Sequence, residues 1–282
     1  MSIQTVMVIG AGQMGGGIAQ VMAQHGIKTY LNDVDMDIVK SRVDFITKLL
    51  DKDIAKGKLT EEQKGAALSN LIPSSDLRDA ADCGLVVEAI VEKMEVKGKV
   101  FSTLDDICKP DCILASNTSS LPITEIAAFT RRPEQVIGMH FMNPVPVMKL
   151  VEIIRGLATS DGTYAAVRDL SLLLGKSPVE VKDVPGFISN RVLEIMVNEA
   201  IYCLSEGVAS AEDIDSVMRL GMNHPMGPLQ LADFIGLDTI LSIMETMYHG
   251  YGDPKYRPCP LLRQYVKAGW LGKKSGRGFY QY

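Results

Sequence analysis

A histidine and a glutamate lie where they could form an acid–base pair. His140 ends the apolar run of residues 135–140, and Glu152 lies within the apolar run of residues 149–154. Both are six residues from Pro146, so two strands that fold back about this proline would place them opposite each other. A carboxylate fixes the tautomer of an imidazole and leaves its far nitrogen for proton transfer. The pair therefore predicts general acid–base chemistry, whereas a buried structural ion pair would give the same pattern.

A glycine-rich segment near the start of the chain has the spacing of a dinucleotide-binding turn. A strand is predicted over residues 5–9 before it, and a helix over residues 16–25 after it. The first glycine permits a tight turn, the second lets a pyrophosphate approach the backbone, and the third allows close packing of the helix on the strand. The start of the helix offers N–H groups to phosphates. The residues predicted to contact the dinucleotide are Gly10, Gly12, Gln13, Met14 and Gly15.

An acidic residue follows the second predicted strand. Asp33 comes after the strand predicted at residues 27–31 and lies 18 residues beyond Gly15, near the spacing of a ribose-binding carboxylate. Such a carboxylate accepts hydrogen bonds from the hydroxyls of the adenosine ribose and repels a 2′-phosphate. The segment therefore predicts NAD in preference to NADP. The alternative is a surface aspartate that happens to follow a glycine-rich turn.

A run of small polar residues follows another predicted strand. The strand at residues 112–115 leads into residues 116–120, which include Asn117 and Ser119. Polar side chains at the carboxyl end of a parallel strand face the ligand crevice, where they can donate to a carbonyl or to the nicotinamide ribose. Ser119 or Ser120 could instead cap the next helix. The residues alone leave both interpretations open.

The spacing of apolar residues predicts an α/β fold for the first two-thirds of the chain. Short apolar runs alternate there with amphipathic ones, which is typical of βαβ units and of a doubly wound, mostly parallel Rossmann-type sheet. Strands are predicted at residues 5–9, 27–31, 85–89, 112–115, 135–140 and 149–154. Helices are predicted at residues 16–25, 37–56, 61–70, 93–108, 123–129 and 162–174.

The pattern changes after the Pro-Gly break at residues 185–186. Strand signals nearly vanish, and helices are predicted at residues 187–207, 211–220, 227–234, 237–248 and 260–268. We therefore expect a dinucleotide-binding domain over residues 1–184 and an all-helical domain over residues 185–282. His224 lies in a Pro- and Gly-rich turn between helices, where a structural role is favoured.

Composition and charge argue against several classes of protein. The 282 residues are 46% hydrophobic and 22% charged, with a net charge of −5, so we do not expect a nucleic-acid-binding or membrane-surface protein. No apolar run reaches the roughly 18 residues of a membrane span, and no leader-like segment is seen. The five cysteines are odd in number and form no metal-ligand pattern. Reduced thiols, no metal and a cytoplasmic location are the expectation.

Six segments, taken in order, resemble the 3-hydroxyacyl-CoA dehydrogenase family. They are VIGAGQMG at residues 8–15, VEAIVE at 87–92, ASNTSSL at 115–121, HFMNPVPVMKLVE at 140–152, DVPGFISNR at 183–191 and GRGFY at 276–280. The resemblance covers essentially the whole chain and is greatest to bacterial members that act on short acyl groups. It implies NAD-dependent interconversion of (S)-3-hydroxybutyryl-CoA and acetoacetyl-CoA. One departure is Met142, where the family often has phenylalanine; bulk and apolarity are kept.

The resemblance also implies roles for individual residues. His140 would be the general acid/base held by Glu152, and Ser119 with Asn190 would bind the reacting oxygen of the substrate. Positions that hold the ribose and nicotinamide end of the cofactor match Glu92, Lys97, Asn143 and Lys274. The helical domain would add a homodimer or higher homo-oligomer interface, with the acyl-CoA held in the cleft between domains. Its many methionines and leucines also suit an ordinary helical core.

Three lysines recur every four residues on the helix predicted at residues 37–56. Lys48, Lys52 and Lys56 lie roughly opposite the apolar face of this helix. The stripe could meet the phosphates of coenzyme A, or it could be a solvated helix face. The resemblance favours Lys56 as a contact of coenzyme A, and we include Lys52 with it.

Two other classes of function fit parts of the sequence. One is a dehydrogenase of another 3-hydroxy acid or of longer 3-hydroxyacyl-CoA substrates; related hydroxyacid enzymes often use a lysine as acid/base, and the pairing of His140 with Glu152 argues against them. The other is a non-enzymatic NAD-binding relative. The presence of Ser119, His140, Glu152 and Asn190 together argues against that class.

Overall fold

The computed structural model describes residues 3–282, which fold into two compact units. The first unit ends at Asp183 and the second begins at Val184. Across the described residues, no helix combines the length and the apolar character that crossing a bilayer requires.

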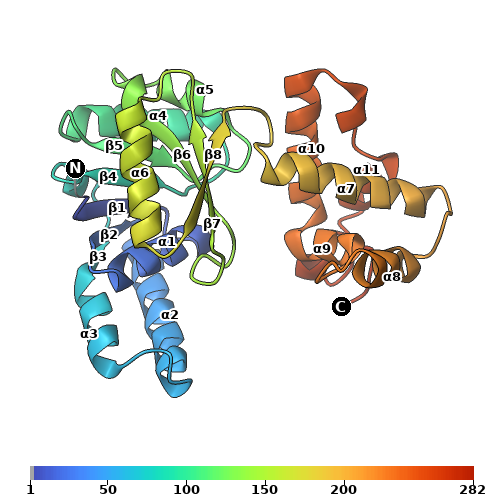
Figure 1. The fold of residues 1–282 in the computed structure, drawn as a ribbon, viewed down its shortest axis with the longest axis horizontal. Helices are drawn as coiled ribbons and strands as arrows, with labels where there is room; N and C mark the ends of the chain where they lie inside the picture. The colour runs from blue at the N-terminus through green and yellow to red at the C-terminus, as the bar shows by residue number, and fades with distance from the viewer. Residues whose placement is uncertain (1–2) are drawn as a thin grey trace. The chain divides into compact units, whose positions relative to one another are not determined.

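The N-terminal unit is built on an eight-stranded sheet with the spatial order β3-β2-β1-β4-β5-β6-β7-β8 (Figure 1). Every neighbouring pair is parallel except β6 and β7. The order of the first six strands is that of the doubly wound dinucleotide-binding fold, which confirms the predicted fold class. The strands are β1 (Thr5–Ile9), β2 (Lys28–Asn32), β3 (Leu71–Ser74), β4 (Leu85–Glu88), β5 (Ile113–Ser116), β6 (Val136–Phe141), β7 (Leu150–Arg155) and β8 (Ser177–Lys182).

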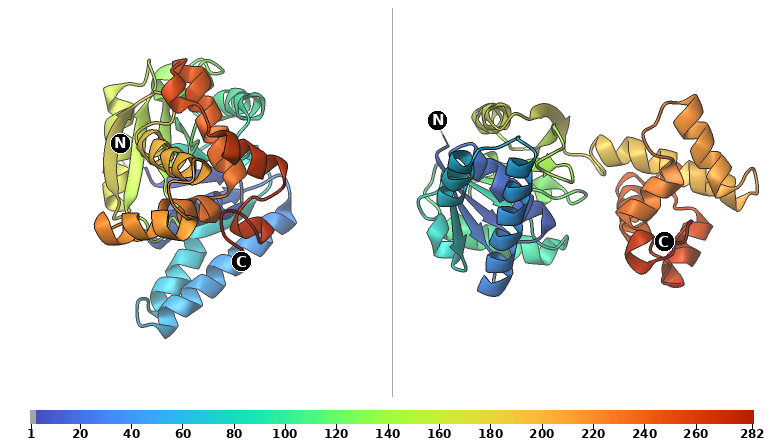
Figure 2. Two further views of the ribbon diagram at one scale, coloured as in Figure 1. Left: turned by 90° about the vertical axis from the view of Figure 1, so that its right-hand side faces the viewer. Right: turned by 90° about the horizontal axis from the view of Figure 1, so that it is seen from below.

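Helices cover both faces of this sheet. α1 and α6 lie on one face and α4 and α5 on the other, while α2 and α3 form a pair that extends beyond the sheet (Figures 1 and 2). The α-helices are α1 (Gln13–Gln24), α2 (Met36–Ala55), α3 (Glu61–Asn70), α4 (Met94–Ile107), α5 (Ile123–Ala127) and α6 (Asp161–Leu173). Two 3₁₀ turns, η1 (Leu77–Ala80) and η2 (Pro133–Gln135), complete the unit.

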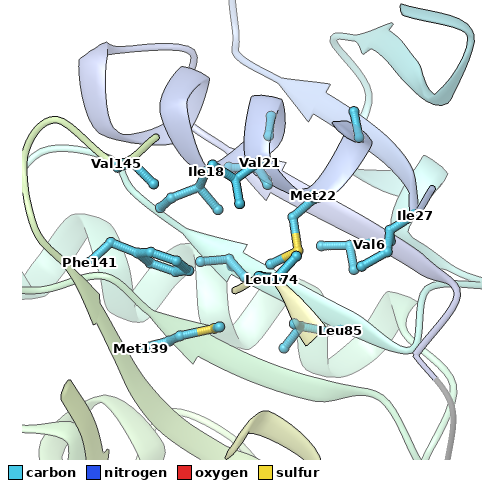
Figure 3. Packing of buried hydrophobic residues seen from close by; sticks show 14 of the residues in the cluster. Val6, Ile18, Val21, Met22, Ile27, Leu85, Met139, Phe141, Val145 and Leu174 are labelled. Atoms are coloured by element: carbon cyan, nitrogen blue, oxygen red, sulfur yellow. The ribbon is translucent and has the colours of Figure 1, made fainter. Parts of the chain in front are cut away.

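The core beneath α1 fixes the glycine-rich turn. Ile18 and Met22 of α1 point toward Phe141 and Met139 of β6 (Figure 3), and each of these side chains is at most 2% exposed. Such burial contributes roughly 1.5–3 kcal/mol per large apolar side chain. The start of α1 and the end of β6 are therefore held by one core, and these are two of the places where the sequence predicts chemistry.

Two strands were absent from the sequence prediction. β3 is four residues long and contains Pro73, and β8 contains Pro178 with exposed side chains at four of its six positions. Both are edge strands, where a proline leaves no ladder hydrogen bond unmade inside the sheet. Edge position also removes the need for continuous apolar residues, so the signal used for the other strands is missing.

The C-terminal unit is helical, as predicted. Its elements are α7 (Ser189–Ser205), α8 (Ala211–Gly221), α9 (Pro228–Ile235), α10 (Leu237–Tyr251), α11 (Pro260–Lys267) and the 3₁₀ turns η3 (Pro254–Tyr256) and η4 (Lys273–Ser275). They enclose a separate core that includes Ile201, Ile240 and Met244. The buried Asp233 carboxylate accepts the backbone N–H groups of Phe279 and Tyr280, which fastens the last residues of the chain to α9.

Candidate active site

His140 and Glu152 are direct partners in the antiparallel register of β6 and β7. The Nδ1 atom of His140 lies 2.8 Å from Oε2 of Glu152, and the two side chains are 6% and 2% exposed. The predicted pairing of the strands is confirmed. A buried carboxylate on Nδ1 makes that nitrogen the N–H donor, so Nε2 is left as the atom that exchanges a proton.

The Nε2 atom of His140 faces the hydroxyl of Ser119, at a distance of 3.0 Å from Oγ. Ser119 lies just beyond β5, in the polar run that the sequence singled out. Hydroxyl, imidazole and carboxylate thus form one hydrogen-bonded line. This arrangement can pass a proton between His140 and an oxygen atom of a ligand that binds beside Ser119.

The helix that follows the polar run is capped by a residue far along the chain. The Asp183 carboxylate accepts the backbone N–H groups of Ile123 at 3.0 Å and Thr124 at 2.7 Å, at the start of α5. The alternative in which Ser119 or Ser120 caps this helix is therefore wrong. The serines are available for the site, and Asp183 supplies the cap that the sequence analysis missed.

A single carboxylate oxygen gathers the polar run into a fixed loop. Oε1 of Glu92 accepts the Thr118 hydroxyl, the Ser119 N–H at 2.9 Å, and both the N–H and the hydroxyl of Ser120 at 3.0 and 3.1 Å. Burial by itself would raise the pKa of Glu92, but the charge of Lys97 and these donors hold the pKa below its ordinary value. Glu92 therefore stays ionised and continues to accept the hydrogen bonds of the loop.

A buried lysine forms an ion pair with Glu92. The Nζ atom of Lys97 lies 2.6 Å from Glu88 and 3.2 Å from Glu92, and both Lys97 and Glu88 are at most 1% exposed. Glu88 also accepts the Ser116 hydroxyl at 2.7 Å and the Ile90 N–H at 2.7 Å. Because an isolated buried charge is costly, these groups depend on one another. The network joins the ends of β4 and β5 to α4.

The glycine-rich turn has the geometry that its spacing predicts. Gly10 has φ of +98°, and a Cβ there would come within 2.5 Å of the Ala89 carbonyl oxygen. A Cβ on Gly15 would clash with the Gly10 carbonyl, so the third glycine is needed for the approach of α1 to the turn. A Cβ on Gly12 would meet no atom of residues 3–282 within 4 Å. Gly12 therefore faces open space, where a bound pyrophosphate can come close to the backbone.

A cavity of about 520 Å³ extends from this turn to the end of β2. Its walls include Gly12, Asp33, Val34, Leu77 and Val91. Oδ2 of Asp33 accepts the Ala11 N–H at 2.8 Å, which ties the carboxylate to the glycine-rich turn. An apolar cleft with one carboxylate at its edge suits an adenosine, whose ribose hydroxyls would bond to Asp33. The residues present therefore fit a dinucleotide.

Two asparagines connect the turn, β5 and β6. The Asn143 Oδ1 atom accepts the Gln13 side-chain N–H at 3.0 Å, so the loop after β6 is bonded to the first residue of α1. Oδ1 of Asn117 accepts the backbone N–H of Phe141 at 2.8 Å, next to His140. Direct hydrogen bonds thus join the glycine-rich turn to the loop after β6, and the end of β5 to the residue that follows His140.

Two family models match the chain. The NAD-binding domain of 3-hydroxyacyl-CoA dehydrogenase matches residues 5–184, and the C-terminal domain of 3-hydroxyacyl-CoA dehydrogenase matches residues 186–282. The chain belongs to the 3-hydroxyacyl-CoA dehydrogenase family. This finding confirms the resemblance inferred from the sequence, and it identifies the cofactor of the Rossmann-type unit as NAD.

Several similar proteins are named 3-hydroxybutyryl-CoA dehydrogenase. A probable 3-hydroxybutyryl-CoA dehydrogenase of Bacillus subtilis (strain 168) is 61% identical over 282 residues, which cover 100% of this chain and 98% of that protein. A 3-hydroxybutyryl-CoA dehydrogenase of Bradyrhizobium diazoefficiens is 55% identical, with 99% and 96% covered. The crystal structure of (S)-3-hydroxybutyryl-CoA dehydrogenase from Ralstonia eutropha is 51% identical with a TM-score of 0.98, and 100% and 99% of the two chains are covered.

Four other predicted residues of this 3-hydroxyacyl-CoA dehydrogenase lie in the C-terminal unit or on α2. Asn190 is a buried residue in the first turn of α7, and Lys274 forms an ion pair with Asp238 at 2.7 Å; both belong to the C-terminal unit. Lys52 and Lys56 are exposed at the end of α2. Their contacts with ligand, and that of Met14, whose side chain packs partly against the core, stay predictions.

No role was predicted from the sequence for Glu88, Ser116 or Thr118. Glu88 is a carboxylate at the end of a fully buried strand, and a carboxylate in that position must be paired. This signal could have led to Lys97 as its partner, nine residues along the chain. Lys97 itself was predicted to contact the cofactor directly; its ammonium is buried against Glu88 and Glu92, so its direct neighbours in this unit are carboxylates.

Proposed function

We propose that this chain is an NAD-dependent (S)-3-hydroxybutyryl-CoA dehydrogenase that interconverts (S)-3-hydroxybutyryl-CoA and acetoacetyl-CoA. The observation that carries the proposal is the line Ser119–His140–Glu152, which lies just beyond β5 and on β6 and β7 of the unit that contains the NAD-binding turn. The names of the relatives at 61% and 55% identity support a four-carbon acyl group.

His140 is the general acid/base of the proposed reaction. When bound, the cofactor would supply the hydride acceptor for oxidation at C3 of the hydroxyacyl group, as NAD, and the hydride donor for the reverse reduction, as NADH. In the oxidation, Nε2 of His140 takes the proton of the C3 hydroxyl; in the reduction, the imidazolium returns it. Glu152 stabilises the imidazolium through Nδ1. Ser119 and Asn190 donate to the reacting oxygen and stabilise its negative charge.

The remaining predicted contacts belong to the cofactor and the thioester. Asp33 binds the adenosine ribose, and the backbone of Gly10–Gly15 with the start of α1 binds the pyrophosphate. The nicotinamide ribose and ring are bound by Glu92, Asn117, Asn143, Ser119 and Lys274. Lys97 acts through Glu92. Lys52 and Lys56 meet the phosphates of coenzyme A.

His140→Gln tests the mechanism. This change should lower kcat for acetoacetyl-CoA reduction by roughly two to four orders of magnitude, because the proton donor is lost. NADH binding, followed by fluorescence titration, should stay within twofold of wild type. His249→Gln, on the exposed end of α10, is the matched control. Undiminished turnover by the His140→Gln variant would contradict the proposed mechanism.

Substrate and cofactor choice test the rest of the proposal. We expect wild-type activity with acetoacetyl-CoA to exceed that with longer 3-ketoacyl-CoA esters and with free acetoacetate. NADH should be preferred over NADPH, and Asp33→Asn should reduce this preference at least roughly tenfold, because a like charge beside the 2′-phosphate is removed. Activity on the free acid alone, or a wild-type preference for NADPH, would contradict the proposal.

We also propose that the enzyme is a homodimer or larger homo-oligomer. Large apolar side chains on the C-terminal unit are exposed in the single chain, among them Val217 and Leu220 of α8 and Val192 of α7. Apolar patches of this kind suit contact with a second copy. Light scattering coupled to size-exclusion chromatography measures the mass, and Leu220→Asp should shift it toward the monomer. A monomeric wild type would refute this part.

A further inference from the structure

The loop that joins β6 to β7 carries a residue predicted to contact the cofactor. This β6–β7 loop covers residues 142–149 and begins two residues after His140. Asn143, near its start, is exposed and is predicted to contact the nicotinamide end of NAD. Its Oδ1 atom accepts the side-chain N–H of Gln13, so its Nδ2 group is the part that can donate to a ligand. The place of this donor therefore depends on what holds the loop.

A buried lysine from outside the loop binds two of the loop's backbone carbonyls. The Nζ atom of Lys176 donates to the Val145 carbonyl at 2.6 Å and to the Met148 carbonyl at 2.9 Å. Lys176 is 7% exposed, and it forms no ion pair with a carboxylate of residues 3–282. Hydrogen bonds from a charged donor are stronger than those from a neutral one. Lys176 therefore ties together two points of the loop that are three residues apart.

The backbone of Lys176 is itself fixed on both sides. α6 ends in a turn in which Gly175 has φ of +66° and the Lys176 N–H donates to the Ser171 carbonyl at 3.0 Å. The next residue, Ser177, donates its N–H to the Lys149 carbonyl at 2.7 Å and begins β8, which pairs with β7. The side chain of Lys176 therefore extends into the loop from a junction that hydrogen bonds hold in place.

The lysine and the loop stabilise each other. Burying an ammonium without a counter-charge is costly, and burial lowers the pKa of Lys176 below its ordinary value. The two loop carbonyls replace part of the water that the ammonium loses on burial. Val145 also belongs to the buried core of Figure 3, and a Cβ on Gly17 of α1 would come within 2.9 Å of the Val145 Cβ. The loop is thus bonded to Lys176 and packed against α1.

We propose that Lys176 is a positioning residue for the cofactor: through the Val145 and Met148 carbonyls, it holds the loop in the conformation in which Asn143 binds the nicotinamide end of NAD. Without these bonds the loop would adopt several conformations, and the affinity for NADH would fall with the fraction that can bind it. The inference rests on the cofactor contact of Asn143 in the proposed function. It gives a role to a buried lysine that neither the motifs nor the resemblance singled out.

Lys176→Met removes the ammonium and keeps most of the length of the side chain. We expect the dissociation constant for NADH, measured by fluorescence titration, to rise roughly tenfold, as for the loss of one charged hydrogen bond. ADP lacks the nicotinamide and its ribose, so its affinity in competition titrations should stay within twofold of wild type. An unchanged affinity for NADH would overturn the proposal. Equal weakening of NADH and ADP would also overturn it, because it would show a general effect on the fold.

A second variant keeps the test open if Lys176→Met does not fold. Lys176→Gln retains an N–H donor without the charge, and it should weaken NADH binding several-fold with the same contrast to ADP. In the cofactor-free protein, amide hydrogen exchange over residues 142–149 should be faster in Lys176→Gln than in wild type and unchanged in β1. Lys99→Met, on the exposed side of α4, is the matched control for the loss of a lysine charge. Unaltered exchange in the loop would refute the role of Lys176.

A double variant tests whether the effect passes through Asn143. Lys176→Gln combined with Asn143→Ala should bind NADH within about twofold of Asn143→Ala alone, because both changes remove the same contact. Additive losses would mean that Lys176 acts on the cofactor by another route, and they would overturn the proposal. Normal NADH binding by Asn143→Ala would overturn it together with the predicted contact. A wild type inactive on acetoacetyl-CoA would refute only the proposed reaction, because binding of NADH and ADP requires no turnover.

Discussion

The Glu92 carboxylate holds the backbone of Ser119: its Oε1 atom accepts the Ser119 N–H at 2.9 Å. On the other side of the same residue, the Ser119 hydroxyl lies 3.0 Å from Nε2 of His140. Glu92 thus sets the position of the hydroxyl that faces His140. Because Lys97 is buried against Glu92, the position of Ser119 depends on a charge inside the protein.

Glu92→Gln should therefore impair catalysis through Ser119. An amide keeps the shape of the side chain but loses the charge that attracts the loop donors and Lys97, so we expect kcat to fall roughly tenfold. Steady-state kinetics with acetoacetyl-CoA at saturating NADH measures the change. The exposed Glu95→Gln, one residue into α4, is the control. An unchanged kcat, with an unchanged KM for NADH, would mean that Glu92 does not position the loop.

The pKa of Glu92 adds a dependence on pH. Its folded pKa is below the ordinary value, so the folded protein holds fewer protons on this group than the unfolded chain does. The stabilisation is therefore complete above the ordinary carboxyl pKa and is lost as the pH falls through the folded pKa. Acid unfolding curves of wild type and Glu92→Gln should converge as the pH falls through this range. Unfolding curves that stay parallel would contradict a lowered pKa of Glu92 in the folded protein.

The acid–base line was predictable from the sequence because it depends on local patterns. His140 and Glu152 lie on neighbouring strands joined by a short loop, and equal spacing from Pro146 gave their register. The glycine-rich turn and Asp33 follow one strand and one helix, so their arrangement is also nearly local. Apolar runs gave the six strands that lie inside the sheet or next to its centre.

Contacts between segments that lie far apart in the sequence could not be predicted from such local patterns. Glu92 bonds to residues 26 to 28 positions away, and Asp183 caps α5 from about 60 positions away. Neither partnership leaves a periodic signal in the sequence, because it depends on how βαβ units stack. The ammonium of Lys97 is buried between two carboxylates, and its contact with the cofactor, which the resemblance implies, stays a prediction. The resemblance alone supplied Asn190 and Lys274.

Glu152→Gln tests the carboxylate of the acid–base pair. The amide oxygen can still accept the Nδ1 proton of His140, but it no longer stabilises the imidazolium by charge. We expect kcat to fall roughly a hundredfold, with the KM for NADH unchanged. Glu180→Gln on the neighbouring strand β8 is the control, since Glu180 is exposed. Full activity of Glu152→Gln would show that the pair is a structural ion pair.

Two glycines of the same turn should respond to alanine in opposite ways. Gly15→Ala forces a methyl group against the Gly10 carbonyl and should lower the free energy of unfolding by about 1–3 kcal/mol or more. Gly12→Ala meets no protein atom within 4 Å across residues 3–282, so its unfolding should match wild type within about 0.5 kcal/mol.

NADH affinity distinguishes the two variants further. The methyl group of Gly12→Ala points into the space proposed for the pyrophosphate, so the KM for NADH should rise roughly tenfold or more. Chemical denaturation and NADH fluorescence titration measure the two effects separately. An unstable Gly12→Ala protein, or one that binds NADH normally, would contradict the assignment of this turn.

Glu194 of α7 should make the protein less stable as the pH rises. It is 1% exposed, its Oε2 atom has no hydrogen-bond partner among the described residues, and burial raises its pKa to about 8. Between the unfolded carboxyl pKa and about 8, the folded state holds a proton that the unfolded chain has lost. The free energy of unfolding therefore declines across this range as pH increases.

Glu194→Gln removes this titration while keeping the size of the side chain. The variant should match wild type in unfolding free energy near pH 5 and exceed it at pH 8 by an amount on the order of 1–4 kcal/mol. Denaturation curves at several pH values measure the difference. Glu199→Gln, on the exposed side of the same helix, should run parallel to wild type throughout. If the Glu194→Gln curve also runs parallel to wild type, Glu194 is ionised in the folded protein and must have a compensating partner.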